Sequence, residues 1–314
     1  MYKKLLVTGC SGVLGAALKR ISHEYPGHEM VFSDSSHCDL TNLDNTLRYV
    51  KSIEPDVIMH LAAVSGGIEL SIKQPATLLR DNVYMNMNIL EAARFHNIKK
   101  TVMTLSSGMY PAEVTNPIRE EYIHNGCPHE SNYSYAFAKR LIEPSIRAYR
   151  AEYGINVVGL VPNGIFGENG DFSYTHSAMW AALIRRFYEN RNNMEKIIIY
   201  GNGLSVREHS YSQDMARAFM WCLENYDEEQ ILNVGTTEEY SVKDIAYMIA
   251  EILQIDKNRI EFDVSKPSGI HRKSIDNSRF IKLSKFEFTP FRTALERTIR
   301  WFCENFDKPE QVLL

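Results

Sequence analysis

The sequence predicts an α/β fold in which a doubly wound parallel sheet is joined to a smaller C-terminal α/β lobe. Short apolar runs alternate with amphipathic stretches over the first half of the chain, which is the pattern of repeated strand–helix–strand units. A glycine-rich turn directly follows the first apolar run. After residue 161 the alternation weakens and prolines and glycines cluster, which indicates a change of architecture.

The expected strands of the sheet are five short apolar runs at residues 5–7, 30–32, 57–61, 101–105 and 156–161. Residues 41–53 and 78–96 carry apolar side chains at three- and four-residue spacing, as expected for helices that cover one face of a sheet. An antiparallel sheet would instead need hairpin signals between adjacent strands. The nearest candidate, Asn125-Gly126, has no strand pattern around it, so a parallel sheet is favoured.

A second lobe is expected to begin near residue 166. It would contain a helix at 179–190, a strand at 197–200 and a helix at 242–253, for which Ser241 and Asp244 provide an N-terminal cap. The helix at 213–224 is apolar enough to return to the first lobe. We therefore expect residues 1–165, together with 205–226, to form the first domain and residues 166–314 to form an interleaved second lobe.

Composition excludes several classes of protein. Hydrophobic residues make up 44% and charged residues 24% of the 314 residues, as in an ordinary folded protein. The net charge of −4, without a long run of lysine or arginine, argues against a nucleic-acid partner. The five cysteines form no CxxC pair, so neither a disulfide framework nor a metal site is expected. The N-terminal apolar run is too short for a signal peptide or a membrane span, and we expect a cytoplasmic protein with no membrane association.

The glycine-rich turn, Gly9-Cys-Ser-Gly12-Val-Leu-Gly15, lies between the first strand and the first helix. Gly9 would permit a tight turn, Gly12 would let the backbone approach a pyrophosphate, and Gly15 would allow close packing of helix on strand. The helix N-terminus would add donors and the positive end of its dipole. At this position the motif predicts a dinucleotide-binding domain of the Rossmann type.

The residues after the second strand should contact the adenosine ribose of the dinucleotide, and they give mixed signals. Asp34 lies nineteen residues beyond Gly15, where an acid can hydrogen-bond the ribose of NAD. Hydroxyl and imidazole groups nearby could instead bind the 2′-phosphate of NADP, namely those of Ser33, Ser35, Ser36 and His37. This stretch contains no arginine, and on its own it leaves both cofactors open.

Ser106, Tyr135 and Lys139 are the predicted catalytic residues. Tyr135 and Lys139 are four residues apart in a helical segment, so the ammonium should lie on the same face as the phenol. The cation should lower the pKa of the phenol toward a value useful for passing a proton to or from a substrate oxygen. Ser106 follows the fourth strand, at the edge where parallel sheets bind ligands. The glycine turn, the strand-end serine and the YxxxK pair, in this chain order, predict an oxidoreductase.

With these motifs the chain resembles the extended short-chain dehydrogenase/reductase family and, within it, the GDP-L-fucose synthases, which epimerise and reduce GDP-4-keto-6-deoxymannose. The resemblance covers nearly the whole chain, and it is carried by residues 60–68, 105–111, 135–139, 182–187, 201–203, 207–208, 266–273 and 276. It implies a 4-keto sugar carried on GDP, NADPH as the hydride donor with NADH as the alternative, and a homodimer.

The resemblance also implies roles for individual residues. Ser106 and Tyr135 would hold and protonate the C4 oxygen, while Lys139 would contact the nicotinamide ribose and tune Tyr135. The other expected cofactor contacts are Gly9, Ser11, Gly12, Val13, Leu14, Gly15, Ser33, Asp34, Ser35, Ser36, Asp39, Leu40, Leu61, Ala62, Ala63, Pro162 and Ile165. The expected substrate contacts are Ser107, Gly108, Asn163, His176, Arg186, Arg207 and Arg272, of which Arg186 and Arg207 resemble the family's arginines near the nucleotide diphosphate.

The chain departs from the family pattern at the two epimerisation positions. The family has a cysteine where this chain has Gly108, and an ungapped comparison places the family's histidine on Ala178. Moving protons at C3 and C5 requires one group to abstract and another to deliver. We therefore expect a C4 reductase without epimerase activity, acting on a GDP-4-keto-6-deoxyhexose or a GDP-4-keto-heptose. His176 or Cys127 would have to substitute if epimerisation occurs.

Three alternatives stay open at this point. The chain could be a bifunctional epimerase/reductase that uses unmatched residues. It could be another nucleotide-sugar enzyme, such as a 4-epimerase or a 4,6-dehydratase, although a dehydratase would want an acid pair where Ser107 and Gly108 stand. It could also be a cofactor-binding sensor without turnover, which the intact Ser106, Tyr135 and Lys139 argue against.

Overall fold

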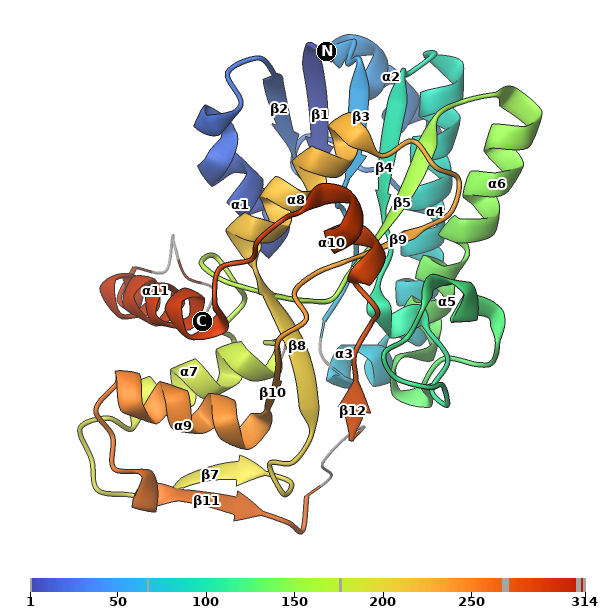
Figure 1. Ribbon diagram of the computed structural model, residues 1–314. Helices are drawn as coiled ribbons and strands as arrows, with labels where there is room; N and C mark the ends of the chain where they lie inside the picture. The colour runs from blue at the N-terminus through green and yellow to red at the C-terminus, as the bar shows by residue number, and fades with distance from the viewer. Residues whose placement is uncertain (1, 67, 175–176, 267–270, 309–311, 313–314) are drawn as a thin grey trace.

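A six-stranded parallel sheet forms the larger lobe of the molecule (Figure 1). The structure is a computed structural model that describes residues 2–66, 68–174, 177–266, 271–308 and 312. The sheet has the order β2-β1-β3-β4-β5-β9, and each neighbouring pair is parallel. Its strands are β1 (Lys4–Thr8), β2 (Glu29–Ser33), β3 (Val57–His60), β4 (Lys100–Thr104), β5 (Val157–Pro162) and β9 (Leu232–Val234). The strand order reverses beside β1, which is where open sheets of this kind bind ligands.

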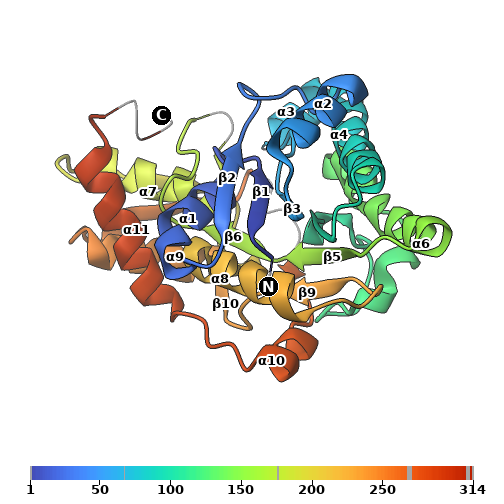
Figure 2. The same ribbon diagram turned by 90° about the horizontal axis from the view of Figure 1, so that it is seen from above.

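Helices cover both faces of this sheet (Figure 2). One face packs against α1 (Val13–Ile21) and α8 (Ser212–Asn225), and the other packs against α2 (Leu43–Ile53), α4 (Pro75–Phe95) and α6 (Ile142–Tyr153). Successive strand residues point to opposite faces, so Leu5 and Val7 join the α1–α8 core while Leu6 joins the α2–α4 core. The strands are buried on both sides, and this explains their unbroken apolar runs. The short helix α5 (Tyr133–Arg140) precedes α6 and packs beside α4.

The smaller lobe lies at the carboxyl ends of the strands (Figure 1). Three strands form a sheet in the order β10 (Glu239–Ser241), β8 (Val206–Tyr211) and β12 (Arg272–Lys273). Strand β6 (Gly164–Phe166) pairs with β8. Strands β7 (Ile197–Tyr200) and β11 (Ile260–Asp263) form a separate parallel pair. The lobe's helices α7 (Met179–Glu189), α9 (Val242–Ile252) and α11 (Phe291–Asn305) enclose an aromatic core that includes Phe166, Trp180 and Phe302.

Short helices complete the chain. They are α3 (Ile68–Lys73), α10 (Ser278–Ser284) and the 3-10 turns η1 (Ser22–Glu24), η2 (Ser107–Met109), η3 (Glu120–His124), η4 (Glu130–Asn132) and η5 (Lys257–Arg259). No helix in the ranges given above is both long enough and apolar enough to cross a bilayer.

The predicted α/β class with a parallel sheet is confirmed, and each of the five predicted strands ends within one residue of its observed limits. The helix expected to return to the first lobe, α8, packs on α1. The sixth strand, β9, was not expected, since three residues carry no periodicity of their own. The domain boundary at residue 165 remains a prediction.

The N-terminus of α9 provides a stability test. Ser241 Oγ accepts a hydrogen bond from Asp244 N at 3.0 Å, and Asp244 Oδ2 accepts one from Ser241 N at 3.0 Å, which is a capping box. We predict that Ser241→Ala lowers the free energy of unfolding by about 1 kcal/mol, measured by urea denaturation. Ser278→Ala, at an exposed position on α10, is the control and should leave the midpoint unchanged. Equal midpoints for all three proteins would show that this cap does not stabilise the lobe.

Candidate active site

A cavity of about 730 Å³ opens at the carboxyl ends of the parallel strands. It is lined by residues that follow β1, β2, β3, β4 and β5 in the sequence, so one end of the sheet supplies nearly all of its wall. The cavity wall includes the glycine turn after β1, and β1 is the strand beside which the strand order reverses. The position agrees with the dinucleotide site that the sequence predicts.

The glycine turn between β1 and α1 leaves no room for side chains at two of its positions. Gly9 has a φ of +73°, and a Cβ there would lie 2.6 Å from the backbone nitrogen of Ala62. A Cβ at Gly15 would lie 2.4 Å from the carbonyl oxygen of Gly9. Gly12 differs, because a Cβ there would meet nothing nearer than the Gly9 oxygen at 3.6 Å. The backbone at Gly12 is therefore open to a close ligand, and the turn fits a dinucleotide pyrophosphate.

The Asp34 carboxylate, directly after β2, forms its hydrogen bonds within its own loop. Its Oδ1 accepts hydrogen bonds from Ser36 N at 3.0 Å and Ser36 Oγ at 2.6 Å, and lies 2.8 Å from His37 Nδ1. The bonds from Ser36 and then from His37 lower the pKa of Asp34 to about 2. Ser36 is thus engaged with Asp34 and, unlike the other expected cofactor contacts, does not line the cavity.

The three predicted catalytic residues meet at the wall formed by β4 and α5. Ser106 follows β4, and its Oγ accepts a hydrogen bond from Gly108 N at 3.1 Å, which caps η2. Tyr135 and Lys139 lie one turn apart on α5. Lys139 Nζ donates to the carbonyl oxygen of Thr104 at 2.9 Å and lies 5.9 Å from the centre of the Tyr135 ring. All three residues line the cavity, so the structure brings them together.

The protonation of Tyr135 differs from the sequence-based expectation. Burial raises the pKa of Tyr135 to about 12, and a hydrogen bond with Ser106 opposes the rise only in part. Burial also lowers the pKa of Lys139 to about 8. The expected lowering of the phenol pKa by Lys139 does not occur in the protein alone, where burial determines the direction of the shift and Ser106 is the group that opposes it. Tyr135 is therefore a neutral phenol with a proton to give.

A buried chain of polar side chains supports α5, and it begins at His60, the first residue of the 60–68 stretch that carries the family resemblance. His60 Nδ1 lies 2.8 Å from Thr8 Oγ1, and His60 Nε2 lies 3.2 Å from Asn86 Oδ1. Asn86 Nδ2 in turn lies 3.5 Å from the carbonyl oxygen of Ala138, beside Lys139. Burial lowers the pKa of His60 to about 3, so the imidazole is neutral and works as a hydrogen-bonding link.

Most of the expected site residues line the cavity. Apart from Ser36, this holds for all of the expected cofactor contacts, and it holds for Ser107 and Asn163 among the expected substrate contacts. Gly108 lies beside Ser106, outside the cavity wall. His176 lies outside the described residues. Sequence reasoning missed several lining residues, namely Cys38, Thr41, Val64, Ser65, Met85, Thr104, Leu105 and Gly164.

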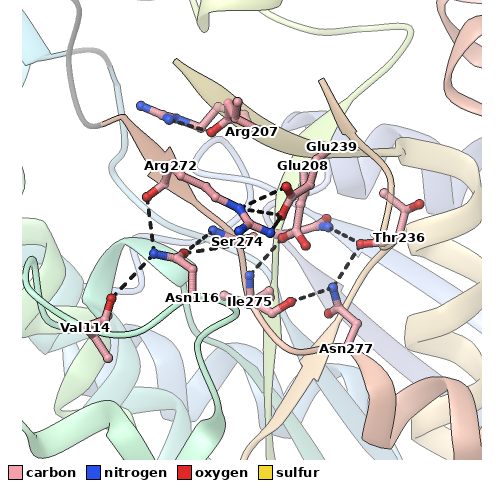
Figure 3. Close-up of polar contacts among 12 residues, drawn as sticks. Val114, Asn116, Arg207, Glu208, Thr236, Glu239, Arg272, Ser274, Ile275 and Asn277 are labelled. Atoms are coloured by element: carbon pink, nitrogen blue, oxygen red, sulfur yellow. Dashed lines mark hydrogen bonds and ion pairs between the residues drawn. The ribbon is translucent and has the colours of Figure 1, made fainter. Parts of the chain in front are cut away.

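Two of the three expected arginines of the smaller lobe lie on the neighbouring strands β8 and β12, in different environments. Arg207 on β8 is the register partner of Lys273 on β12, so the two cations stand side by side. Burial lowers the pKa of both, that of Lys273 to about 8, and neither forms an ion pair with a described residue. Arg272 instead pairs with Glu239, with Nη2–Oε1 at 2.9 Å. Figure 3 shows Arg207 pointing away from the Arg272–Glu239 pair. Lys273 was missed because its partner strand is far away in the sequence.

Side-chain hydrogen bonds fix the strand that carries Lys273 (Figure 3). Asn116 Oδ1 accepts from Ser274 N at 2.8 Å, and Glu208 Oε2 accepts from Ile275 N at 3.0 Å. Asn277 Nδ2 donates to the carbonyl oxygen of Thr236 at 3.0 Å. Residues 272–277 are thereby tied to three segments that are distant in the sequence.

Arg186 lies further from the cavity. It extends from α7 to the carbonyl oxygen of Ile198, with its guanidinium carbon 5.3 Å from the centre of the Tyr200 ring. With Tyr174 and Tyr200 it lines a separate hollow of about 280 Å³.

Comparisons with known proteins agree with this geometry. The model of the NAD dependent epimerase/dehydratase family matches residues 5–235. The chain belongs to this family. A relative from Dictyostelium discoideum, named GDP-L-fucose synthase, is 35% identical over 310 residues and is matched over 97% of each chain. The resemblance drawn from the sequence is therefore confirmed at the level of the family.

Solved structures give the same result. A GDP-L-fucose synthetase from Naegleria fowleri, bound to NADP, is 30% identical with a TM-score of 0.90, over 98% of this chain and 95% of the other. A GDP-6-OMe-4-keto-L-xylo-heptose reductase from Campylobacter jejuni has the same fold, with a TM-score of 0.90 at 23% identity, over 96% and 98% of the two chains. The family fold is thus present throughout the described part of this chain.

Glu208 on β8 is a buried carboxyl group that contacts the segment after Lys273. It is 6% exposed, and burial raises its pKa to about 8, while the hydrogen bond from Ile275 N opposes the rise. A glutamate in the unfolded chain titrates near pH 4.3. Between these two values the folded protein binds a proton that the unfolded chain has released, so stability falls as the pH rises.

We predict that Glu208→Gln, which cannot ionise, gains stability relative to the parent protein as the pH rises from 5.5 to 7.5. The gain should not exceed roughly 1.4 kcal/mol per pH unit, measured by urea unfolding at each pH. Glu195→Gln, at an exposed position, is the control. A stability difference between Glu208→Gln and the parent that stays constant over this range would contradict the prediction.

Proposed function

We propose that the protein is an oxidoreductase that reduces the C4 keto group of a GDP-linked 4-keto sugar with NADPH and lacks C3/C5 epimerase activity. The observation that carries the proposal is the meeting of Ser106, Tyr135 and Lys139 at a dinucleotide-shaped cavity, beside a position that has no side chain, Gly108. The NADP in the Naegleria fowleri structure supports the choice of cofactor. The sugar would be a 6-deoxyhexose or a heptose.

Reduction needs a hydride at C4 and a proton on the C4 oxygen. The bound cofactor supplies the hydride. Tyr135 supplies the proton, which is favourable because the alkoxide that forms at C4 is more basic than a phenolate. Ser106 donates a hydrogen bond to the same oxygen, and the Lys139 ammonium stabilises the phenolate left on Tyr135 until solvent returns the proton.

Epimerisation at C3 or C5 needs an acid and a base, and the two family positions supply neither. Gly108 has no side chain, and Ala178, which precedes α7, has only a methyl group. Cys127 is exposed in the loop before α5 and does not line the cavity. These residues support reduction without epimerisation.

The nucleotide end of the substrate would lie toward the smaller lobe. Arg207 and Lys273 form a desolvated pair of cations without a carboxylate partner among the described residues, which suits a diphosphate. Arg186 lies at the adjoining α7–β7 surface. Arg272 forms an ion pair with Glu239, so we expect it to contribute less than Arg207 and Lys273 to binding of the diphosphate.

The proposal predicts oxidation of NADPH by GDP-4-keto-6-deoxymannose or a GDP-4-keto-heptose, without deuterium uptake at C3 or C5 in D2O. Tyr135→Phe removes the proton donor and should lower kcat by 10² to 10⁴-fold, roughly the range for a lost general acid. Absorbance at 340 nm follows the cofactor, and NMR of the product locates deuterium.

Three outcomes would contradict parts of this proposal. Deuterium at C3 or C5 would establish epimerase activity. Undiminished oxidation by Tyr135→Phe would remove Tyr135 as the acid. Absence of oxidation with any GDP-4-keto sugar would favour a cofactor-binding sensor.

We also propose a homodimer formed through α4 and α6, in the cytoplasm. Large apolar side chains are exposed on these two helices, namely Tyr84 and Phe95 of α4, Tyr153 at the end of α6 and Leu141 directly before α6, which is 43% exposed. Exposed large apolar side chains on neighbouring helices suit a protein interface. All five cysteines are unpaired, which suits a reducing compartment.

If the α4–α6 surface is the dimer interface, Leu141→Glu should convert the dimer into a monomer, because it buries a charge within the contact. Light scattering after gel filtration measures the mass. Leu283→Glu is the matched control, since Leu283 is similarly exposed but lies on α10. A parent protein that is already monomeric, or a Leu141→Glu variant that stays dimeric, would contradict this interface.

A further inference from the structure

The carboxamide of Asn132 lies beside Ser106 and forms no hydrogen bond within the described part of the chain. Asn132 precedes α5 as its N-cap, a position where asparagine commonly accepts a hydrogen bond from the first helical turn. Here no such bond forms, and no described residue bonds to this carboxamide. Asn132 is half-buried, so its carboxamide stays accessible to a ligand, whereas the buried Asn163, Asn233 and Asn277 each donate to a backbone carbonyl.

The position of the carboxamide explains why it does not cap the helix. A Cβ added at Gly108 would lie 2.9 Å from Asn132 Nδ2 and 3.2 Å from Ser106 Oγ. The Asn132 amide therefore occupies the space beside Ser106 into which a side chain at position 108 would extend. Only a glycine at position 108 leaves the amide undisturbed.

Asn132 also faces a recess of about 260 Å³ beside the large cavity. The recess and the cavity share Tyr135 and Ser65, and Ser71 and Ser131 add hydroxyl groups to its wall. If Tyr135 protonates the oxygen of one ring carbon, a substituent on the neighbouring ring carbon would reach this recess. Its polar wall suits a hydroxylated ligand.

We propose that the Asn132 carboxamide binds the C3 hydroxyl of the sugar and is a specificity-determining residue for the reduction. The inference rests on the proposed function. Of the two ring carbons next to C4 in a hexopyranose, only C3 carries a hydroxyl, so a polar contact beside the C4 carbonyl falls on that group. A carboxamide can both donate to and accept from a hydroxyl, and it exchanges no proton at neutral pH. It thus holds C3 without being able to invert it.

The test compares two substrates in two proteins. The parent protein should prefer a GDP-4-keto-6-deoxyhexose over its 3-deoxy analogue by about tenfold in kcat/KM, the scale of one lost hydrogen bond in a polar site. Asn132→Ala should lower kcat/KM for the hydroxylated sugar by about tenfold and bring the ratio between the two sugars close to one. Asn132→Asp, which keeps the size but loses the donor, should also reduce the preference.

Two controls separate recognition from structure. NADPH affinity, measured by fluorescence titration, should be unchanged in Asn132→Ala, which establishes that the cavity is folded. Asn192→Ala removes an exposed asparagine from the turn between α7 and β7 and should keep the parent ratio. If Asn132→Ala fails to fold, Asn132→Asp carries the same comparison.

The contact between positions 108 and 132 gives an independent test. Gly108→Ala should lower kcat/KM for the hydroxylated sugar in the parent protein, because the new methyl group displaces the Asn132 amide. The same change should have a smaller effect when residue 132 is already alanine. Strictly additive effects would mean that the two positions do not act on the same group.

The outcomes distinguish this inference from the function on which it rests. A parent protein that reduces no GDP-4-keto sugar overturns both. A parent protein that reduces the sugar, with an Asn132→Ala variant that lowers kcat/KM equally for the hydroxylated and 3-deoxy substrates, overturns only the assignment of Asn132, because a structural role would act on both alike.

Discussion

The site depends on the burial of Lys139, which has no carboxylate partner among the residues that the structure describes. Its ammonium donates to the carbonyl oxygen of Thr104 at the end of β4, which fixes α5 against the carboxyl edge of the sheet. Because Tyr135 lies one turn earlier on the same helix, this bond also sets the phenol beside Ser106. Loss of water around the two groups moves their pKa values in opposite directions, so the free protein carries a neutral phenol next to a readily released ammonium proton.

The sequence predicted the features that depend on local pattern. The five strands and the long helices have clear periodicity, and the glycine turn has a geometry that few residue types allow, so their positions were predicted closely. It could not predict features that arise when distant segments meet. Lys273 stands beside Arg207 only because β12 pairs with β8, and three-residue β9 is a strand only because β5 offers an edge. The direction of the Tyr135 pKa shift depends on burial, which no spacing of residues reveals.

One face of β8 carries cations, and the other carries a carboxyl group whose pKa burial raises to about 8. Arg207 points to one side, next to Lys273, and its neighbour Glu208 points to the other, toward the backbone of Ile275. The alternation of side chains along a strand keeps the cations apart from the carboxyl group although they are adjacent in sequence. The cation pair stays available for a ligand, while the glutamate helps to hold the strand on which Lys273 lies.

The hydrogen bonds of residues 272–277 join the lobes in a way that restricts how the chain can diverge. The segment bonds to Asn116 in a loop of the sheet-bearing lobe, to Glu208 on β8 and to the loop after β9. The residues that would recognise the sugar nucleotide thus come from several separate segments of the sequence. Exchange of a whole substrate lobe between relatives would break these cross-links, so new sugar preferences in such a molecule should arise by single substitutions at the cleft, of which a glycine at position 108 is an example.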